Sequence, residues 1–262
     1  MNQLCKLLLC ATLTTLVSAC ATTESVKPEI AQQIKRVAVV STIGDVFQRQ
    51  YTGATVFGNE WHELKVPQWG LNRIYEEQLA AELRKSHGMT VALGSDSAET
   101  AAQIVKAASA GNEADMAAIG KLLPAYCAAN SLDAVFVVVR PRRSVGVGVY
   151  SVRHPQIGWE ANLVVASQLA LYGCTARDYL ATRVVRAEPP KDVAPKDAAQ
   201  KDPVYKKRKA TGPVIPSMPL PEGWPWYGKW EPELYEKARV EVIKLPQAGW
   251  TETLSAMLKP AL

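Results

Sequence analysis

Long apolar runs, histidines and catalytic motifs are all scarce in this chain of 262 residues. The apolar run near the N-terminus, residues 7–17, is about half as long as a membrane-spanning helix needs, which excludes such a helix there. The sequence contains no Gly-x-Ser-x-Gly elbow, Walker phosphate loop, His-Glu-x-x-His or Cys-x-x-Cys. The chain therefore cannot be assigned by motif to the enzyme classes that carry these sequences.

Histidine is limited to His62, His87 and His154. His62 and Glu63 are neighbours on a predicted strand, so their side chains point to opposite faces and do not act as a pair. His87 fits a helix end, and His154 precedes a proline in a predicted turn. Because a metal site needs ligands at a suitable spacing, the sequence predicts no metal, no cofactor and no histidine-based catalytic site.

Residues 1–19 have the parts of a secretory signal, namely a positive charge at Lys6, a short apolar stretch and small residues before a cleavage point. A cysteine follows directly, in Val17-Ser18-Ala19-Cys20. This sequence resembles the lipobox of bacterial lipoproteins, in which the signal is removed in front of a cysteine that carries acyl chains. The resemblance implies that Cys20 becomes the lipidated first residue of the mature chain. The alternative is an ordinary signal peptide that leaves Cys20 as a plain thiol.

The residue after this cysteine is Ala21 rather than Asp. In proteobacterial lipoproteins this resembles the outer-membrane sorting pattern, which implies a bacterial outer-membrane protein anchored through acyl chains on Cys20 and facing the periplasm. Residues 20–35 are polar and lack strong periodicity, so we expect a short tether that reaches at most roughly 50 Å.

Three cysteines remain after removal of the signal: Cys20, Cys127 and Cys174. With Cys20 acylated, Cys127 and Cys174 are the only pair available within the chain, and an oxidising periplasm permits a disulfide. The alternative is two separate buried thiols, because Cys127 is expected in a helix and Cys174 in a turn.

The composition, 48% hydrophobic and 21% charged, is typical of a folded globular chain. The net charge of +5 is too small to indicate nucleic acid, and export makes that partner unsuitable. We expect the partner to be an envelope protein or an anionic envelope polymer.

The pattern of apolar residues predicts one mixed α+β core domain over residues 36–187. The expected elements are a strand at 36–43, a hairpin at 46–57 and 60–66, a helix at 72–87, a strand at 89–93, helices at 96–108 and 113–129, and a central strand at 133–139. Three strands at 144–152, 159–172 and 180–187 then follow as an antiparallel meander. We expect all strands to form one sheet.

The remaining chain divides into two predicted parts. Residues 188–223 are rich in Pro and Lys, which is typical of a flexible insertion. Residues 224–262 are expected to pack on the core as an aromatic segment and two helices, at 232–243 and 247–258, that cover a face of the sheet.

The strand Asp133-Ala-Val-Phe-Val-Val-Val139, the order of elements and the lipobox together resemble the periplasmic domains of curli-secretion-channel lipoproteins and the N-terminal domain of TolB. The resemblance spans residues 36–187. It implies a periplasmic domain of mixed α and β structure.

Four arginines form the first candidate site. Arg140, Arg142 and Arg143 follow the central strand, where open sheets commonly bind ligands, and Arg153 lies further along the chain. Guanidinium groups bind phosphate or carboxylate with two parallel hydrogen bonds, so the set is a candidate anion-binding site. The alternative is a solvated strand exit, because charged side chains are usually exposed.

Four aromatic residues form the second candidate site: Trp224, Trp226, Tyr227 and Trp230. Trp and Tyr commonly anchor protein interfaces, which favours a partner-binding surface. The alternative is a segment packed over the core, because aromatic side chains bury large areas.

These observations predict a non-catalytic outer-membrane lipoprotein that binds another envelope component, as an accessory in assembly, secretion or cell-wall synthesis. The alternative is an envelope hydrolase with a carboxylate-based site, because paired carboxylates have no characteristic spacing in a sequence.

Overall fold

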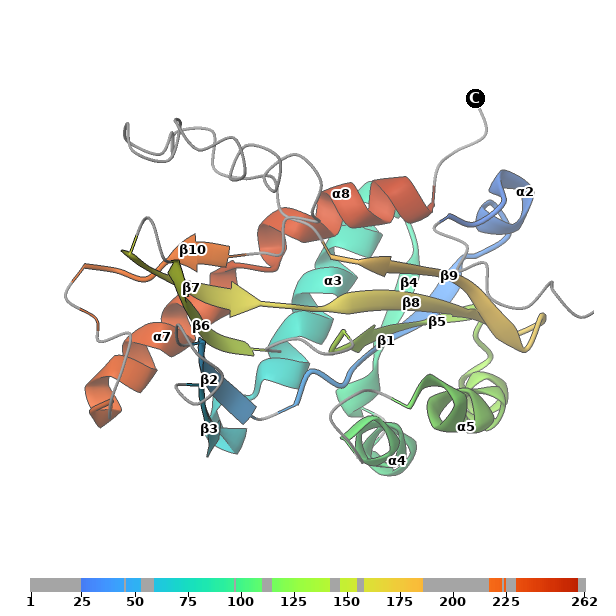
Figure 1. Cartoon of the computed structure of the whole chain (residues 1–262). Helices are drawn as coiled ribbons and strands as arrows, with labels where there is room; N and C mark the ends of the chain where they lie inside the picture. Colours follow the sequence, from blue (N-terminus) through green and yellow to red (C-terminus); the bar gives the residue numbers. More distant parts are fainter. Residues whose placement is uncertain are drawn as a thin grey trace, which may run out of the picture.

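The β-branched run that begins at Arg36 forms β1 (Arg36–Ser41), around which the first sheet is built. In the computed structural model, β1 lies between β4 (Thr90–Leu93) and β5 (Ala134–Val139) and is parallel to both. The antiparallel strands β8 (Gln168–Gly173) and β9 (Asp178–Val184) complete the order β4-β1-β5-β8-β9 (Figure 1). All six residues of β5 are buried, so the predicted central strand is confirmed.

The structure describes residues 25–44, 46–52, 59–96, 98–109, 115–141, 147–154, 158–185, 217–222, 224 and 230–258. Cys20, Arg142, Arg143, Trp226 and Tyr227 lie outside this part of the chain, so the structure does not bear on the predictions made for them.

A second sheet begins with the predicted hairpin, β2 (Val46–Thr52) and β3 (Glu60–Lys65), whose antiparallel pairing is confirmed. On its other side β2 is parallel to β6 (Val147–His154), which pairs with β7 (Gly158–Val165). Gly148 is opposite Gln48, where an added Cβ would overlap the Gln48 carbonyl, so this pairing requires glycine.

The mixed α+β class is confirmed, but the prediction of one sheet is wrong. The predicted strand at 159–172 is interrupted at Ala166 and Ser167, both buried, and the chain passes there from β7 in the second sheet to β8 in the first. The apolar alternation continues across this junction because both sheets face the same core. Leu163 and Leu169 belong to that one cluster although they lie in different sheets.

Helices cover both faces of the first sheet. On one face Val37 and Phe136 pack with α3 (Leu71–His87) and the C-terminal helices. On the other face Val135 packs with α4 (Ala98–Ser109) and α5 (Met116–Asn130) (Figure 1). The three helices lie where the apolar spacing predicted them. Two short 3-10 turns, η2 (Pro67–Trp69) and η3 (Gly94–Asp96), precede α3 and α4.

The C-terminal helices α7 (Pro232–Lys244) and α8 (Gln247–Met257) return to the core as predicted. Their junction is held on α3 by two side chains. The Tyr75 hydroxyl donates to the Val242 carbonyl at 2.9 Å, and Gln78 Nε2 donates to the Ile243 carbonyl at 2.8 Å.

The prediction of a tether over residues 20–35 is wrong for its second half. A short helix, α2 (Pro28–Ala31), lies there, flanked by Val26 and Ile34, which are both 4% exposed. The Val26 N–H donates to the Met257 carbonyl at 2.8 Å. Val26, Ile30 and Ile34 recur every four residues, an apolar spacing that the sequence analysis missed.

The predicted insertion at 188–223 also ends earlier than expected. Residues 217–219 form β10 (Ser217–Pro219), which pairs antiparallel with β7 and completes the order β10-β7-β6-β2-β3. Pro219 is tolerated because β10 is an edge strand. Within the described ranges, no helix combines the length and apolarity required to span a bilayer.

Candidate functional site

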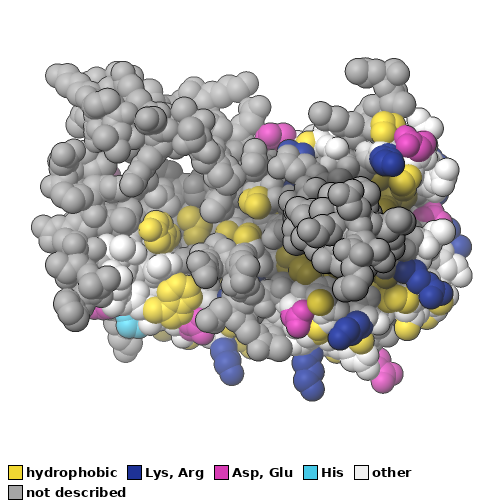
Figure 2. Space-filling model, turned by 45° about the vertical axis from the view of Figure 1, so that its right-hand side comes forward, with side chains coloured by type: hydrophobic (Ala, Val, Ile, Leu, Met, Phe, Trp, Pro, Cys, Tyr) yellow, Lys and Arg dark blue, Asp and Glu magenta, His cyan; other side chains and the backbone are white. Residues whose placement is uncertain are grey.

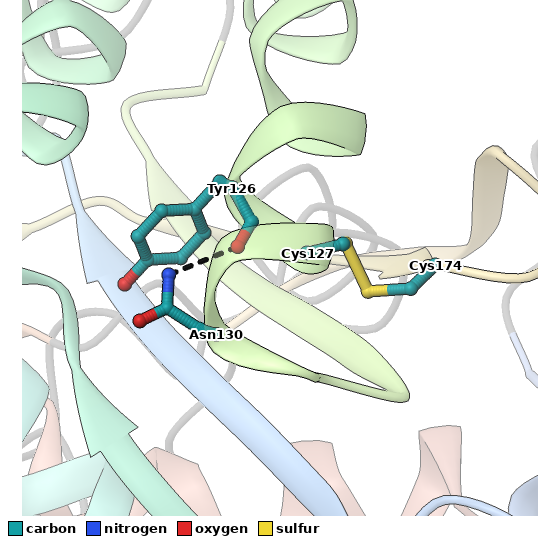
Figure 3. The surroundings of a disulfide bond; sticks show 4 residues. All are labelled: Tyr126, Cys127, Asn130 and Cys174. Atoms are coloured by element: carbon teal, nitrogen blue, oxygen red, sulfur yellow. Dashed lines mark hydrogen bonds between the residues drawn. A yellow bond between two sulfur atoms is a disulfide. The ribbon is translucent and has the colours of Figure 1, made fainter.

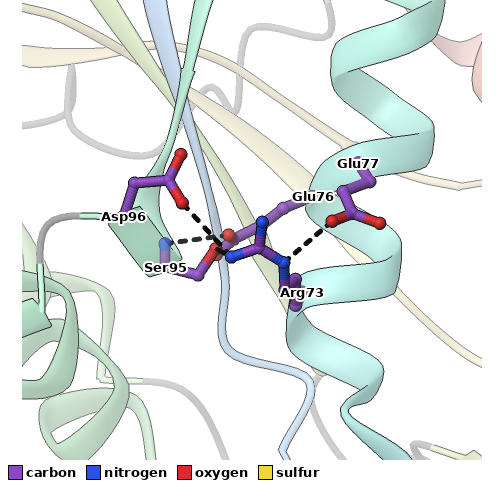
Figure 4. Close-up of polar contacts among 5 residues, drawn as sticks. All are labelled: Arg73, Glu76, Glu77, Ser95 and Asp96. Carbon is purple, nitrogen blue, oxygen red and sulfur yellow. Dashed lines mark hydrogen bonds and ion pairs between the residues drawn. The ribbon is translucent and has the colours of Figure 1, made fainter.

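The carboxyl ends of β4, β1 and β5 meet at one end of the first sheet because these three strands are parallel. Open sheets commonly bind ligands at this end. Polar side chains from three segments meet there, and Figure 4 draws those from α3 and from the segment after β4. The full set is Ser41, Asn72, Arg73, Glu76, Ser95 and Asp96. We refer to these residues as the strand-end cluster.

Glu76 is the buried centre of the strand-end cluster, with only 2% of its surface exposed. One carboxylate oxygen accepts the Ser41 N–H at 2.9 Å, and the other accepts the Ser95 N–H at 2.9 Å. A Cβ at Gly94 would lie 3.1 Å from the Glu76 carboxylate and 2.9 Å from a Val40 methyl group, so this close approach favours glycine. Glu76 therefore joins α3 to the ends of β1 and β4.

Around Glu76 the cluster becomes exposed. The Asn72 side-chain oxygen accepts from the Ser41 hydroxyl at 3.2 Å and from the Gly44 N–H at 3.1 Å. Arg73 donates to Glu77 at 2.8 Å and to Asp96 at 3.2 Å, and hydrogen bonds to these carboxylates raise the pKa of Arg73. These ion pairs are more than half exposed, so they contribute little to stability.

A second polar group lies on β3. Glu63 accepts hydrogen bonds from Gln48 Nε2 at 2.8 Å and from Trp61 Nε1 at 3.1 Å. These bonds lower the pKa of Glu63, the bond from Gln48 most strongly, and the charge of Arg140 contributes further. Trp61 remains 47% exposed although its ring nitrogen is engaged. Arg140, the first residue after β5, therefore lies close enough to Glu63 for their opposite charges to attract.

The structure describes only part of the predicted set of four arginines. Arg140 interacts with Glu63, a residue of β3, whereas Arg153 lies near the end of β6. Gly148, which pairs with Gln48, is five residues from Arg153, or about 17 Å of strand. The side chain of Arg153 lies outside the described part, as do Arg142 and Arg143. The predicted anion site therefore stays a prediction, of which the structure describes only the surroundings of Arg140.

The partner-binding prediction is wrong for Trp230, which is only 2% exposed. The centre of its ring lies 5.7 Å from that of Phe47, in a tilted contact, and 5.5 Å from that of half-buried Trp224, in an edge-to-face contact, as the packing alternative predicts. The Arg49 guanidinium lies 4.9 Å from the centre of the Trp230 ring. Burial lowers the pKa of Arg49, and a hydrogen bond with Tyr235 counteracts this effect.

Cys127 and Cys174 are bonded as a disulfide, which the sequence analysis left open (Figure 3). The bond joins α5 to the end of β8, across residues that are 47 positions apart. Nearby, Asn130 Nδ2 donates to the Tyr126 carbonyl at 2.9 Å and ties the last turn of α5 together.

No group of three or more His, Cys, Asp or Glu side chains in the described ranges is arranged to hold a metal ion. The chain matches no protein-family model, no curated protein and no solved structure.

Proposed function

We propose that this chain is a non-catalytic lipoprotein of the bacterial outer membrane that binds another envelope component, as an accessory in assembly, secretion or cell-wall synthesis. The observation that carries the proposal is the sequence Val17-Ser18-Ala19-Cys20 at the end of a complete signal. Acyl chains on Cys20 would hold the chain at the membrane, because two or more chains give stable attachment.

The disulfide supports export. Disulfides persist in oxidising compartments such as the periplasm and are rare in the reducing cytosol. The Cys127–Cys174 bond links two elements of the core, and Cys127 is only 5% exposed. A bond between two elements of the core suits a chain that folds after crossing the inner membrane.

The exposed face of the β2–β3 hairpin is the partner-binding surface that we favour. Trp61 is a large apolar side chain that remains 47% exposed on β3, which is an edge strand. Glu63 and Arg140 provide opposite charges beside Trp61. Trp and Arg are the residue types that most often dominate binding energy in protein interfaces. We call Trp61, Glu63 and Arg140 the hairpin surface.

Labelling with a clickable fatty acid tests the anchor. We expect the wild-type chain to incorporate label in a bacterial host and Cys20→Ala to lose it, while Cys127→Ala retains it. An unlabelled wild-type chain would contradict the proposal.

Crosslinking in intact cells followed by affinity recovery tests the partner surface. A hot-spot tryptophan contributes about 2 kcal/mol or more, so Trp61→Ala is expected to reduce recovery of the partner by at least about tenfold. Val240→Ala is the matched control, because Val240 is an equally exposed apolar residue, 48%, on α7. Equal recovery from both variants would exclude the hairpin surface.

The same recovery experiment separates the hairpin surface from the Pro/Lys-rich segment. A deletion of residues 190–212 removes that segment and leaves β10 intact, which matters because β10 pairs with β7. Retention of the partner by this deletion is expected. Its loss would assign binding to the segment.

A further inference from the structure

The connection between the proposed lipid anchor and the folded chain is very short. Five residues, 21–25, separate Cys20 from Val26, the first buried residue of the core. An extended chain spans at most about 3.6 Å per residue, so Val26 lies within roughly 22 Å of the lipidated cysteine. This reach is less than half of the roughly 50 Å expected for a tether over residues 20–35, because α2 belongs to the folded chain.

The segment that follows Val26 is fixed to the core and adds no length to the flexible connection. The Val26 N–H is bonded to the end of α8, and Ile34 is buried. The Asp133 carboxylate then accepts the N–H groups of Lys35 and Arg36, at 2.8 and 2.7 Å. The anchor is therefore attached to one defined end of the molecule, at the start of β1.

From this attachment we infer that one end of the molecule, the anchor end, rests against the anionic lipid headgroups of the membrane. The anchor end consists of α2, the start of β1, and the last turns of α3 and α8, which lie together in Figure 1. The β2–β3 hairpin lies at the opposite end of the molecule (Figure 1). In the inferred orientation it therefore faces away from the bilayer. This inference rests on the proposed acylation of Cys20.

The charge of the anchor end suits a membrane that contains anionic lipids. Its exposed basic side chains are Lys27, Lys35, Arg36, Arg84 and Lys85. Glu29 is an exposed acidic neighbour, and the Asp133 carboxylate is engaged by two backbone N–H groups. Figure 2 shows the molecule with this side turned forward, and Lys and Arg side chains stand along its lower and right-hand parts together with Asp and Glu. Basic groups gain from anionic headgroups only within about 8 Å, and the short connection keeps the anchor end near enough to the membrane to reach that range.

Energy transfer from a single thiol label to a headgroup-labelled acceptor lipid tests the inference. In the mature chain Cys20 would be acylated and Cys127 bonded to Cys174, so an introduced cysteine is the only free thiol. The full mature lipoprotein is reconstituted in vesicles of phosphatidylethanolamine and phosphatidylglycerol. Lys27→Cys and Lys85→Cys carry the label at the anchor end.

The control labels are His62→Cys on β3 and Glu236→Cys on α7, both with side chains 60% exposed. A domain of this length is about 45 Å across, so these positions should be far from the headgroups. We expect severalfold higher transfer from positions 27 and 85 than from 62 and 236. Replacing phosphatidylglycerol with a zwitterionic lipid should lower this ratio, and an unchanged ratio would remove the anionic headgroups from the inference.

Flotation of the vesicles separates the two proposals. Protein that floats with the vesicles but gives equal transfer from all four positions would overturn the orientation and leave the anchor intact. Protein that does not float would overturn the anchor and the orientation together.

Discussion

At the scale of single residues, Glu76 is the side chain whose loss should affect the fold most. Gln in its place has one acceptor oxygen, so the N–H of either Ser41 or Ser95 would face an NH2 group in a buried site. An unsatisfied buried donor costs about 2 kcal/mol, and we expect Glu76→Gln to lower the free energy of unfolding in urea by that amount. Glu77→Gln is the control, because its ion pair with Arg73 is exposed and contributes at most about 0.5 kcal/mol. Equal effects would contradict the structural role of Glu76.

His87, in the last turn of α3, should make the stability of the fold depend on pH. Burial lowers the pKa of His87 in the folded chain, and the nearby Glu82 opposes this only in part. The unfolded chain therefore binds a proton more readily, so the contribution of His87 to stability is present above about pH 6.5 and decreases as the pH falls below it. We expect the free energy of unfolding in urea to fall less between pH 7 and pH 5 in His87→Gln than in the wild type. An identical pH profile in both proteins would contradict this prediction.

At the scale of elements, the disulfide should stabilise the contact between α5 and β8. Closing a loop across 47 positions restricts the unfolded chain by about 4 kcal/mol in the chain-entropy estimate. We expect a reductant to lower the unfolding midpoint of the wild-type protein in urea, with little effect on a Cys127→Ala, Cys174→Ala double variant. If the midpoint of the wild type is the same with and without reductant, the bond does not stabilise the domain.

The elements also show what the sequence could and could not predict. The helix at α3, the hairpin β2–β3 and the buried strand β5 were predictable because each has a local signal: apolar residues at helical spacing, a turn, or a continuous apolar run. The parallel pairing of β2 with β6 joins residues about 100 positions apart, and no local signal encodes it. The division into two sheets was hidden because the alternation of apolar residues continues through Ala166 and Ser167.

The candidate site was less predictable than the fold for a related reason. Arg140 was found from its place after β5, but the residues beside it, Trp61 and Glu63, come from a different sheet. Glu76 lies within the predicted helix at 72–87, and nothing in the sequence indicates its two backbone partners. Both groups depend on contacts between distant segments, and such contacts follow from topology.

At the scale of the whole molecule, the buried segment at Val26 to Ile34 is part of the domain. Val26 and Ile34 contribute two buried side chains to the core, and α2 lies between them. Removing a buried Val or Ile side chain costs about 2 kcal/mol or more, so Ile34→Ala should lower the free energy of unfolding by that amount. Gln33→Ala is the control, because Gln33 is exposed and next in sequence. Similar stability in both variants would show that the segment does not pack as described.

The length of the connection in front of Val26 should control the orientation of the whole molecule on the membrane. A flexible linker of about 20 Gly and Ser residues inserted after Ser25 has a root-mean-square span of roughly 25 Å and a much longer extended reach. The anchor end would then no longer be held near the headgroups, and we expect energy transfer from a label at Lys27 to fall towards that from a label at His62. The same linker inserted after Gln200 leaves the five-residue connection intact and should preserve the difference between the two labels. If the insertion after Ser25 has no effect, the basic side chains rather than the short connection set the orientation.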